Sequence, residues 1–297
     1  MIYKIVLKSI GDITLLPDSQ KLFGFLMSQF SEYFTDDEVS GFVDDVYDNK
    51  TKCMISNLLP EGYMPFPKSY ILDTISENSK DIYKLIKKMD YIDETSLVSI
   101  IKYFNSYNEV AHNSDKLKCI DELEKVIGSK ISFISTKQRY SQKFKLESQE
   151  KAIPGLPNKA YSLPILEYYL NSSALKLELF SFFVEVEKNS ILASYIEYLY
   201  KSTKNKEIVY GLGSKVSHGY NTYKLKNVER YNDENNEKKH ILINMGMLIP
   251  RVENINNEGS FLEIYSSNRK SYEISDNIEK VISFIAPGSV INLKHKG

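Results

Sequence analysis

A glycine-rich stretch in the C-terminal half constrains the fold of this chain more than any other feature. Residues 208–225 read IVYGLGSKVSHGYNTYKL. Apolar and polar residues alternate on both sides of the glycines, and an alternation of period two is typical of β-strands. Glycine allows a positive φ and a close approach of the backbone to a neighbour. The stretch therefore predicts two strands joined by a glycine-rich loop.

The loop between these strands has the composition of a phosphate-binding loop. Between residues 200 and 230, seven Lys or Arg stand against two Glu. Cationic loops that are rich in backbone amides favour phosphate groups. A plain hairpin turn is the simpler alternative. The candidate RNA-contacting residues in the loop are Gly211, Gly213, Ser214, Lys215, Ser217, His218, Gly219 and Tyr220.

Known nucleotide-binding motifs do not fit this loop. A P-loop reads G-x-x-x-x-G-K-[ST], whereas Gly211 and the pair Ser214-Lys215 stand in the wrong order and spacing. A dinucleotide fingerprint needs a glycine where Val216 stands. Both motifs also need a helix after the loop, but residues 220–228 alternate like a strand. The sequence therefore supports neither nucleotide-binding fold.

The overall composition indicates a soluble globular protein with no metal, no cofactor and no membrane span. The 297 residues suffice for one large or two ordinary domains, and 42% of them are hydrophobic. The formal net charge is −1, so any binding to nucleic acid must be local. Two isolated cysteines without a C-x-x-C motif argue against structural zinc and disulfides, and they fit a reducing cytoplasm.

The N-terminal third predicts a strand followed by helices. Residues 2–8 alternate, and the next apolar stripe predicts a helix from Asp18 or Ser19 to Phe34, in which we expect Gly24 to mark close packing. Residues 31–50 hold seven carboxylates and one Lys. Such a run is usually a solvated face or loop, and a docking edge for a basic partner is the alternative.

The middle of the chain predicts an irregular loop, a helical insertion and a boundary. Three prolines and a glycine make regular structure unexpected over residues 57–68. Residues 81–89, 93–107 and 115–127 have helical patterns. Prolines and a glycine over 151–164 suggest a division into residues 1–153 and 154–297. Both parts begin strand–helix, so we expect an α+β fold of two ferredoxin-like, RRM-like domains, with the helical insertion in the first.

A second cationic segment lies before this boundary. Lys137, Arg139, Lys143 and Lys145 are interleaved with Tyr140 and Phe144. Aromatic rings beside cations are typical of grooves that bind single-stranded nucleic acid. An ordinary exposed strand explains this segment equally well. The candidate contacts outside the glycine-rich loop are Lys137, Arg139, Tyr140, Lys68, Ser19 and Lys21.

Four features together resemble the RAMP superfamily of CRISPR effector subunits, and most of all the fourth subunit of the type III-A (Csm) complex. They are the glycine-rich loop itself, the helix start PDSQKLFGFL, the segment SNLLP followed by MPFP, and the turn Pro287-Gly288-Ser289. The loop differs at one position, because Asn221 stands where these loops usually have another glycine. The resemblance implies two ferredoxin-like RAMP domains and no catalysis.

The same resemblance implies a role and a set of partners. The protein would hold the 5′ handle of the crRNA, dock the large polymerase/cyclase subunit and a backbone RAMP subunit, and meet target RNA only indirectly. Two alternatives stay open. A related RAMP class cuts precursor crRNA, and His218 is the candidate acid–base group. A protein that only scaffolds others would make no RNA contact of its own.

Overall fold

The structure is a computed structural model, and its description covers most of the chain. The described residues are 1–30, 32–74, 80–99, 131–145, 159–171, 173, 175–202, 207–231, 241–249, 252–267 and 281–294. The predicted helix over 115–127 and most of the one over 93–107 lie outside these ranges.

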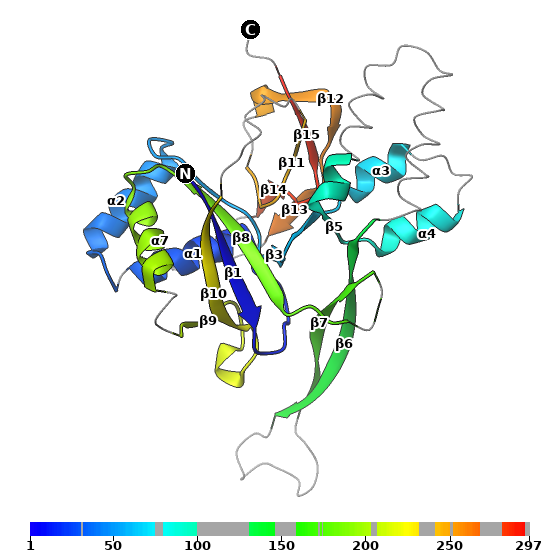
Figure 1. Ribbon diagram of the computed structural model, residues 1–297, viewed down its shortest axis with the longest axis horizontal. Helices are drawn as coiled ribbons and strands as arrows, with labels where there is room; N and C mark the ends of the chain where they lie inside the picture. The colour runs from blue at the N-terminus through cyan, green and yellow to red at the C-terminus, as the bar shows by residue number, and fades with distance from the viewer. Residues whose placement is uncertain are drawn as a thin grey trace, which may run out of the picture.

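A six-stranded sheet forms the centre of the molecule (Figure 1). Its strand order is β2-β8-β1-β10-β9, with β3 also paired to β8, and every ladder is antiparallel. The strands are β1 (Ile2–Ser9), β2 (Cys53–Ile55), β3 (Leu59–Pro60), β8 (Leu179–Val186), β9 (Val209–Gly211) and β10 (Thr222–Tyr231).

The central strands and two helices form a ferredoxin-like unit. Helix α1 (Ser19–Phe30) connects β1 to the β2 side of the sheet, and α7 (Ile191–Ser202) connects β8 to the β9–β10 hairpin. The order β2-β8-β1-β10 with these two crossovers is the β-α-β-β-α-β arrangement. The predicted α+β class and ferredoxin-like topology are therefore confirmed. The division at residue 154 stays a prediction, although strands from both sides of it pair within this one sheet.

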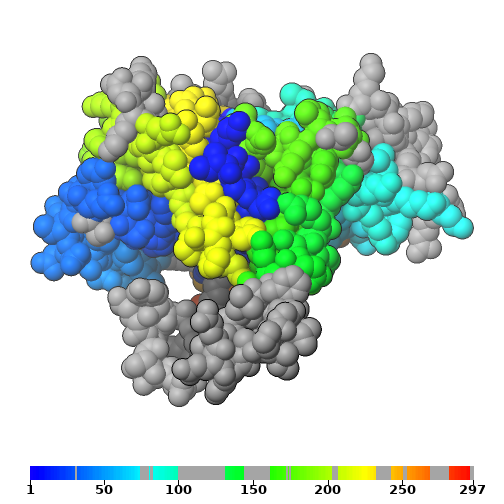
Figure 2. Space-filling model, turned by 90° about the horizontal axis from the view of Figure 1, so that it is seen from below, coloured from blue at the N-terminus to red at the C-terminus, as the bar shows by residue number. Residues whose placement is uncertain are grey.

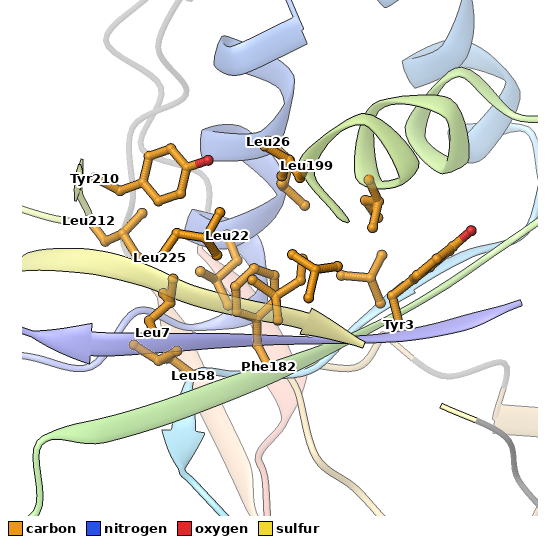
Figure 3. Packing of buried hydrophobic residues seen from close by; sticks show 14 of the residues in the cluster. Tyr3, Leu7, Leu22, Leu26, Leu58, Phe182, Leu199, Tyr210, Leu212 and Leu225 are labelled. Carbon is orange, nitrogen blue, oxygen red and sulfur yellow. The ribbon is translucent and has the colours of Figure 1, made fainter. Parts of the chain in front are cut away.

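One face of this sheet packs against α1 and α7 and holds the main core. Tyr3, Ile5 and Leu7 alternate along β1 and are all buried, as their spacing predicts. Figure 3 shows the leucines of α1 and Leu199 of α7 lying over the strand side chains, which include Phe182 and Leu225. Because successive residues of a strand point to opposite faces, the period-two pattern was enough to identify this buried face.

The start of α1 agrees with its prediction, whereas the end of the helix, the segment after it and the role of Gly24 differ. Asp18 caps α1 by accepting a hydrogen bond from the Lys21 amide at 3.0 Å, as expected. The helix ends at Phe30 rather than Phe34, and the acidic run continues as a second helix, α2 (Asp36–Tyr47). Thr35 and Glu38 form a capping box at its start. The expectation for Gly24 was wrong, because a Cβ there would meet nothing within 4 Å.

A second sheet includes a long two-stranded hairpin that extends away from the first sheet. Its strands are ordered β4-β5-β6-β7, and two short helices, α3 (Lys68–Thr74) and α4 (Lys80–Lys88), join its first two strands. The expectation of irregular structure over 57–68 was wrong, because β3 and β4 lie in this segment and pair with β8 and β5. The strands are β4 (Tyr63–Pro65), β5 (Tyr91–Asp93), β6 (Phe133–Lys145) and β7 (Lys159–Leu170).

The C-terminal part adds two smaller sheets behind these elements (Figure 1). One is ordered β11-β15-β12, and the other pairs β13 with β14. Among the residues with a described structure, no helix combines the length and apolar character that a membrane crossing requires. The strands are β11 (Ile241–Ile243), β12 (Ile255–Phe261), β13 (Ile264–Ser267), β14 (Ile282–Ile285) and β15 (Val290–Leu293).

Candidate nucleic-acid interface

The glycine loop, defined as Gly211–Tyr220, joins two paired strands as the sequence predicts. Gly211 of β9 stands opposite Thr222 of β10, so the loop closes an antiparallel hairpin. A 3₁₀ turn over Val216–His218 lies inside it. Lys215 and Gly219 flank this turn with φ values of 61° and 81°, both in the left-handed region.

Asn221 fixes the glycine loop to the segment that follows β1. Its side-chain oxygen accepts from the Thr14 amide at 2.9 Å, and its side-chain nitrogen donates to Thr14 Oγ1 at 2.8 Å. The same nitrogen donates to the Ser214 carbonyl inside the loop at 2.8 Å. The Asn221 amide donates to the Asp12 carbonyl at 2.9 Å. Because Asn221 is buried, these bonds hold the two segments together away from water.

Gly11 lets the two segments approach this closely. A Cβ at Gly11 would overlap the carbonyl oxygen of Gly219 and Oγ1 of Thr222. Any larger residue at this position would therefore push the glycine loop away from the turn after β1. The loop is consequently a supported structure rather than an isolated hairpin tip.

The β6–β7 hairpin forms the other wall of this region. Lys215 Nζ lies 4.6 Å from the ring centroid of Tyr161 on β7, and Lys143 Nζ of β6 lies 5.5 Å from that of Tyr220. Tyr220 also packs with Leu163 and Ile165 of β7. Figure 2 shows the loop, in yellow, in contact with the hairpin, in green, on one face of the molecule.

Three lysines of the β6–β7 hairpin and the glycine loop lie against aromatic rings. Among the residues that the structure describes, no Asp or Glu pairs with Lys137, Lys143 or Lys215. Lys137 lies over the Tyr169 ring at 4.5 Å. A hydrogen bond with Tyr220 raises the pKa of Lys143. These lysines therefore offer positive charge to an anion.

Arg139 differs from these lysines because it already has partners. Its guanidinium donates to Asp12 at 2.9 Å and to Glu167 at 3.1 Å. Hydrogen bonds with Glu167 and Asp12 raise the pKa of Arg139. It links the β6–β7 hairpin to the turn after β1, so its position favours a structural role over the predicted RNA contact.

The two predicted stacking tyrosines have opposite environments. Tyr140 on β6 is 63% exposed, whereas Tyr220 is only 9% exposed beneath Lys143 and β7. A base can stack on Tyr140 without any rearrangement. The ring of Tyr220 is occupied by protein contacts, so its burial does not support a stacking role.

The predicted residues outside this face are engaged elsewhere. Lys68, at the start of α3, donates to Asp90 at 3.1 Å. Ser19 is buried, and its hydroxyl accepts from the Met247 amide at 2.9 Å. Lys21 lies in the first turn of α1, where its amide bonds to Asp18. The structure thus does not join these three residues to the glycine loop.

His218 is exposed at the tip of the loop. Its Nδ1 lies 3.2 Å from Ser217 Oγ. Within the part of the chain that the structure describes, no carboxylate contacts this ring and no cluster of three or more His, Cys, Asp or Glu residues has metal-binding geometry. The arrangement suits hydrogen bonding to an anion, with Ser217 and Lys215 as neighbouring donors.

Among known proteins, the chain is similar to solved structures. No protein-family model and no curated protein matches the chain. A chain in the crystal structure of the Csm3-Csm4 subcomplex of the type III-A CRISPR-Cas interference complex is similar, with a TM-score of 0.53 and 15% identity over 98% of this chain and 93% of that chain. The chain therefore shares the fold of that solved chain.

A second solved structure supports the same RAMP-like fold. It is a chain of the type III-B Cmr-beta complex bound to cognate target RNA and AMPPnP, with a TM-score of 0.50, 11% identity, and coverage of 98% of this chain and 86% of that chain. The fold that the motif resemblance implied is thereby shared with chains of two type III complexes.

The departure from the RAMP loop pattern at Asn221 has a structural explanation. Asn221 adopts a φ of 51°, a left-handed conformation that glycine and asparagine tolerate best. Asparagine therefore keeps the backbone shape that a glycine would give and adds the bonds to Thr14 and Ser214. Sequence reasoning noted Asn221 only as a departure from the loop pattern and gave no role to Asp12 or Tyr161. An asparagine where these loops usually have glycine was the one available signal, because asparagine tolerates a left-handed conformation.

Proposed function

We propose that this protein is a non-catalytic RNA-binding subunit of a type III CRISPR effector complex, and that it holds the 5′ handle of the crRNA. The observation that carries the proposal is that Lys143 and Lys215, which form no ion pair among the described residues, lie beside a loop that Asn221 and Gly11 hold in place, with Lys137 further along β6. The RAMP-like fold adds support, because the similar solved chains come from type III complexes.

The chemistry of this face suits a single-stranded RNA backbone. Lysine ammonium groups and loop amides bind phosphate oxygens. The exposed Tyr140 ring, which the strand register places on the other side of β6 from Lys143, offers a surface for one base. The whole chain has a formal net charge of only −1, so this local group of cations decides where RNA is attracted. RNA recognition commonly combines phosphate contacts with stacking on unpaired bases.

The proposal includes protein partners within the same complex. A backbone RAMP subunit would bind on one side and the large polymerase/cyclase subunit on another, and target RNA would be met only indirectly. The solved Csm3-Csm4 subcomplex, to which this chain is similar in fold, is itself an assembly of two such subunits. Its composition motivates the backbone partner proposed here.

The handle-binding proposal is tested by charge reversal on the lysine group. Lys143→Glu combined with Lys215→Glu is compared with Lys188→Glu, which lies beyond the end of β8 that pairs with the start of β1. We expect the double variant to bind handle RNA more weakly. The magnitude of the slope of log K against log salt should decrease by about 1.4, because each lost phosphate contact with a single strand accounts for roughly 0.7. An unchanged affinity and slope would remove the glycine loop from the RNA interface.

A ribonuclease that processes precursor crRNA is the second candidate function. The exposure of His218 beside Ser217 and Lys215 favours it, because an acid–base group must reach the scissile phosphate. Incubation of the purified protein with repeat RNA separates the two functions. A cleavage product that disappears in His218→Ala would establish the nuclease, whereas repeat RNA that the unaltered protein binds and leaves intact supports the binding subunit.

A further inference from the structure

A pair of exposed tyrosines marks a second surface on the helical layer. Tyr33, just after α1, is 48% exposed, and its ring centroid lies 5.0 Å from that of Tyr198 on α7, which is 42% exposed. Behind them, the buried Tyr195 lies 5.5 Å from Tyr33 and 5.1 Å from Phe30. The outer rings are therefore held in place by the core and yet open to solvent.

Carboxylates surround these rings. Glu32 precedes Tyr33, and Asp36 and Asp37 follow it in the first turn of α2, all of them exposed. In the described part of the chain, no Lys or Arg pairs with these three carboxylates. A hydrogen bond with Tyr198, partial burial and the neighbouring charges of Tyr198 and Glu32 raise the pKa of Tyr33 to about 12.

Helix stability explains this arrangement only in part. Asp36 and Asp37 favour the positive end of the α2 dipole, and Glu38 belongs to the capping box with Thr35. Glu32 and Tyr33 lie outside both helices, so neither the dipole nor the cap accounts for them. An exposed aromatic pair beside unpaired carboxylates therefore calls for a partner.

Elsewhere on helix α7, an aromatic ring and a carboxylate together bind an arginine. Arg230 lies 5.8 Å from the ring centroid of Tyr200 and donates to both carboxylate oxygens of Glu197, at 2.9 and 2.8 Å. A ring and a carboxylate on α7 thus hold an arginine of the chain itself. Tyr33 with Glu32 and Asp36 offers the same groups without a cation from the described residues.

We infer that the tyrosine face, defined as Glu32, Tyr33, Asp36, Asp37 and Tyr198, docks an arginine-bearing segment of a protein partner. Guanidinium groups stack on aromatic rings and pair with carboxylates at the same time. RNA is disfavoured here because its phosphates would meet three unpaired carboxylates. Figure 2 shows the blue surface that contains α2 at one side of the molecule, apart from the green β6–β7 hairpin. The inference does not depend on the handle-binding proposal.

The test uses the full chain and a fluorescent peptide with three arginines separated by Gly-Ser pairs. A matched peptide carries citrulline, which keeps the shape of arginine and lacks the charge. We expect the arginine peptide to bind at low salt and the citrulline peptide to bind at least about tenfold more weakly. Because both peptides meet the unaltered protein, this comparison does not depend on the folding of any variant.

Variants then locate the binding. We expect Tyr33→Ala to weaken the arginine peptide roughly two- to fivefold and Tyr33→Phe to leave it unchanged. Asp36→Asn with Asp37→Asn should weaken it more than Asp44→Asn with Asp48→Asn, which removes the same charge near the far end of α2.

Three results would overturn the inference. Equal binding of the arginine and citrulline peptides would exclude guanidinium recognition. Equal weakening by the two asparagine pairs would leave only a diffuse attraction to an acidic helix. Loss of binding to a labelled oligouridylate in Tyr33→Ala would show that this face stacks RNA bases instead of arginine.

Discussion

Asn221 and Thr14 are 207 residues apart and are joined by two reciprocal hydrogen bonds of 2.9 and 2.8 Å. This pair holds the glycine loop against the turn that follows the first strand. Backbone conformation and side-chain bonding both depend on Asn221, and two substitutions separate these contributions.

Asn221→Gly should destabilise the protein less than Asn221→Ala. Both variants leave Thr14 and Ser214 without their partner, which costs about 1–3 kcal/mol for buried polar groups. Alanine also pays about 1–2 kcal/mol for the left-handed φ that glycine adopts freely. Urea unfolding of the three proteins measures the difference. An alanine variant as stable as the glycine variant would contradict the role of the positive φ.

Gly11→Ala and Gly24→Ala should change stability in opposite directions. A Cβ at Gly11 overlaps Gly219 and Thr222, so we expect a loss of about 1–3 kcal/mol from overpacking. A Cβ at Gly24 meets nothing within 4 Å, so alanine should stabilise α1 by about 1 kcal/mol. Thermal unfolding of both variants checks the signs, and a stabilised Gly11→Ala would disprove the close approach of the loop.

Glu197 should stabilise the fold in a pH-dependent way. It accepts hydrogen bonds from Arg230 and Tyr3, and these lower its pKa despite partial burial. A carboxyl group with a lowered folded-state pKa stabilises the fold above its unfolded-state pKa, and this contribution is lost as the pH falls through the folded-state pKa. Glu197→Gln should therefore be less stable than the parent at pH 7, with a difference that shrinks below about pH 4.5. A difference that does not change between pH 7 and pH 3 would contradict this assignment.

Tyr140→Ala and Tyr220→Ala should separate RNA stacking from folding. Loss of an exposed stacking ring at Tyr140 should weaken handle RNA binding by about 1–3 kcal/mol with little change in salt slope or stability. Tyr220→Ala should lower the free energy of unfolding, because Tyr220 packs with Leu163 and Ile165. Affinity measurements and denaturant unfolding on both variants test this. Normal RNA affinity in Tyr140→Ala would remove this ring from the interface.

Prediction from the sequence was correct where the local pattern of residues determines the secondary structure. The alternation around Tyr3 and Ile5 identified the buried face of β1, and the capping residue Asp18 placed the start of α1. The carboxylates of the acidic run are largely exposed, as expected of a solvated face, but the helix α2 itself was not predicted because the run has few apolar residues. Phe42 is the one buried residue of that helix, and its packing on Phe30 is a tertiary contact. Patterns of period 3.6 are weak evidence when a helix buries so little.

The candidate interface, too, could be predicted only in part. Three glycines, a lysine and a tyrosine within ten residues were enough to single out Gly211–Tyr220, because those residue types carry the chemistry themselves. The sequence could not predict which cations lack a carboxylate partner, since Arg139 contacts Asp12 and Glu167 only because segments distant in the sequence pack together.

The sequence by itself determined the strand–loop–strand unit, the first strand and helix, and the RAMP-like resemblance, since each depends on residue types at short spacing. Only the tertiary structure decided that Asn221 and Gly11 support the loop, that Lys143 joins Lys215 there, and that Tyr220 is covered while Tyr140 is open. These properties depend on which distant segments pack together, and packing is a property of the whole chain rather than of any short stretch.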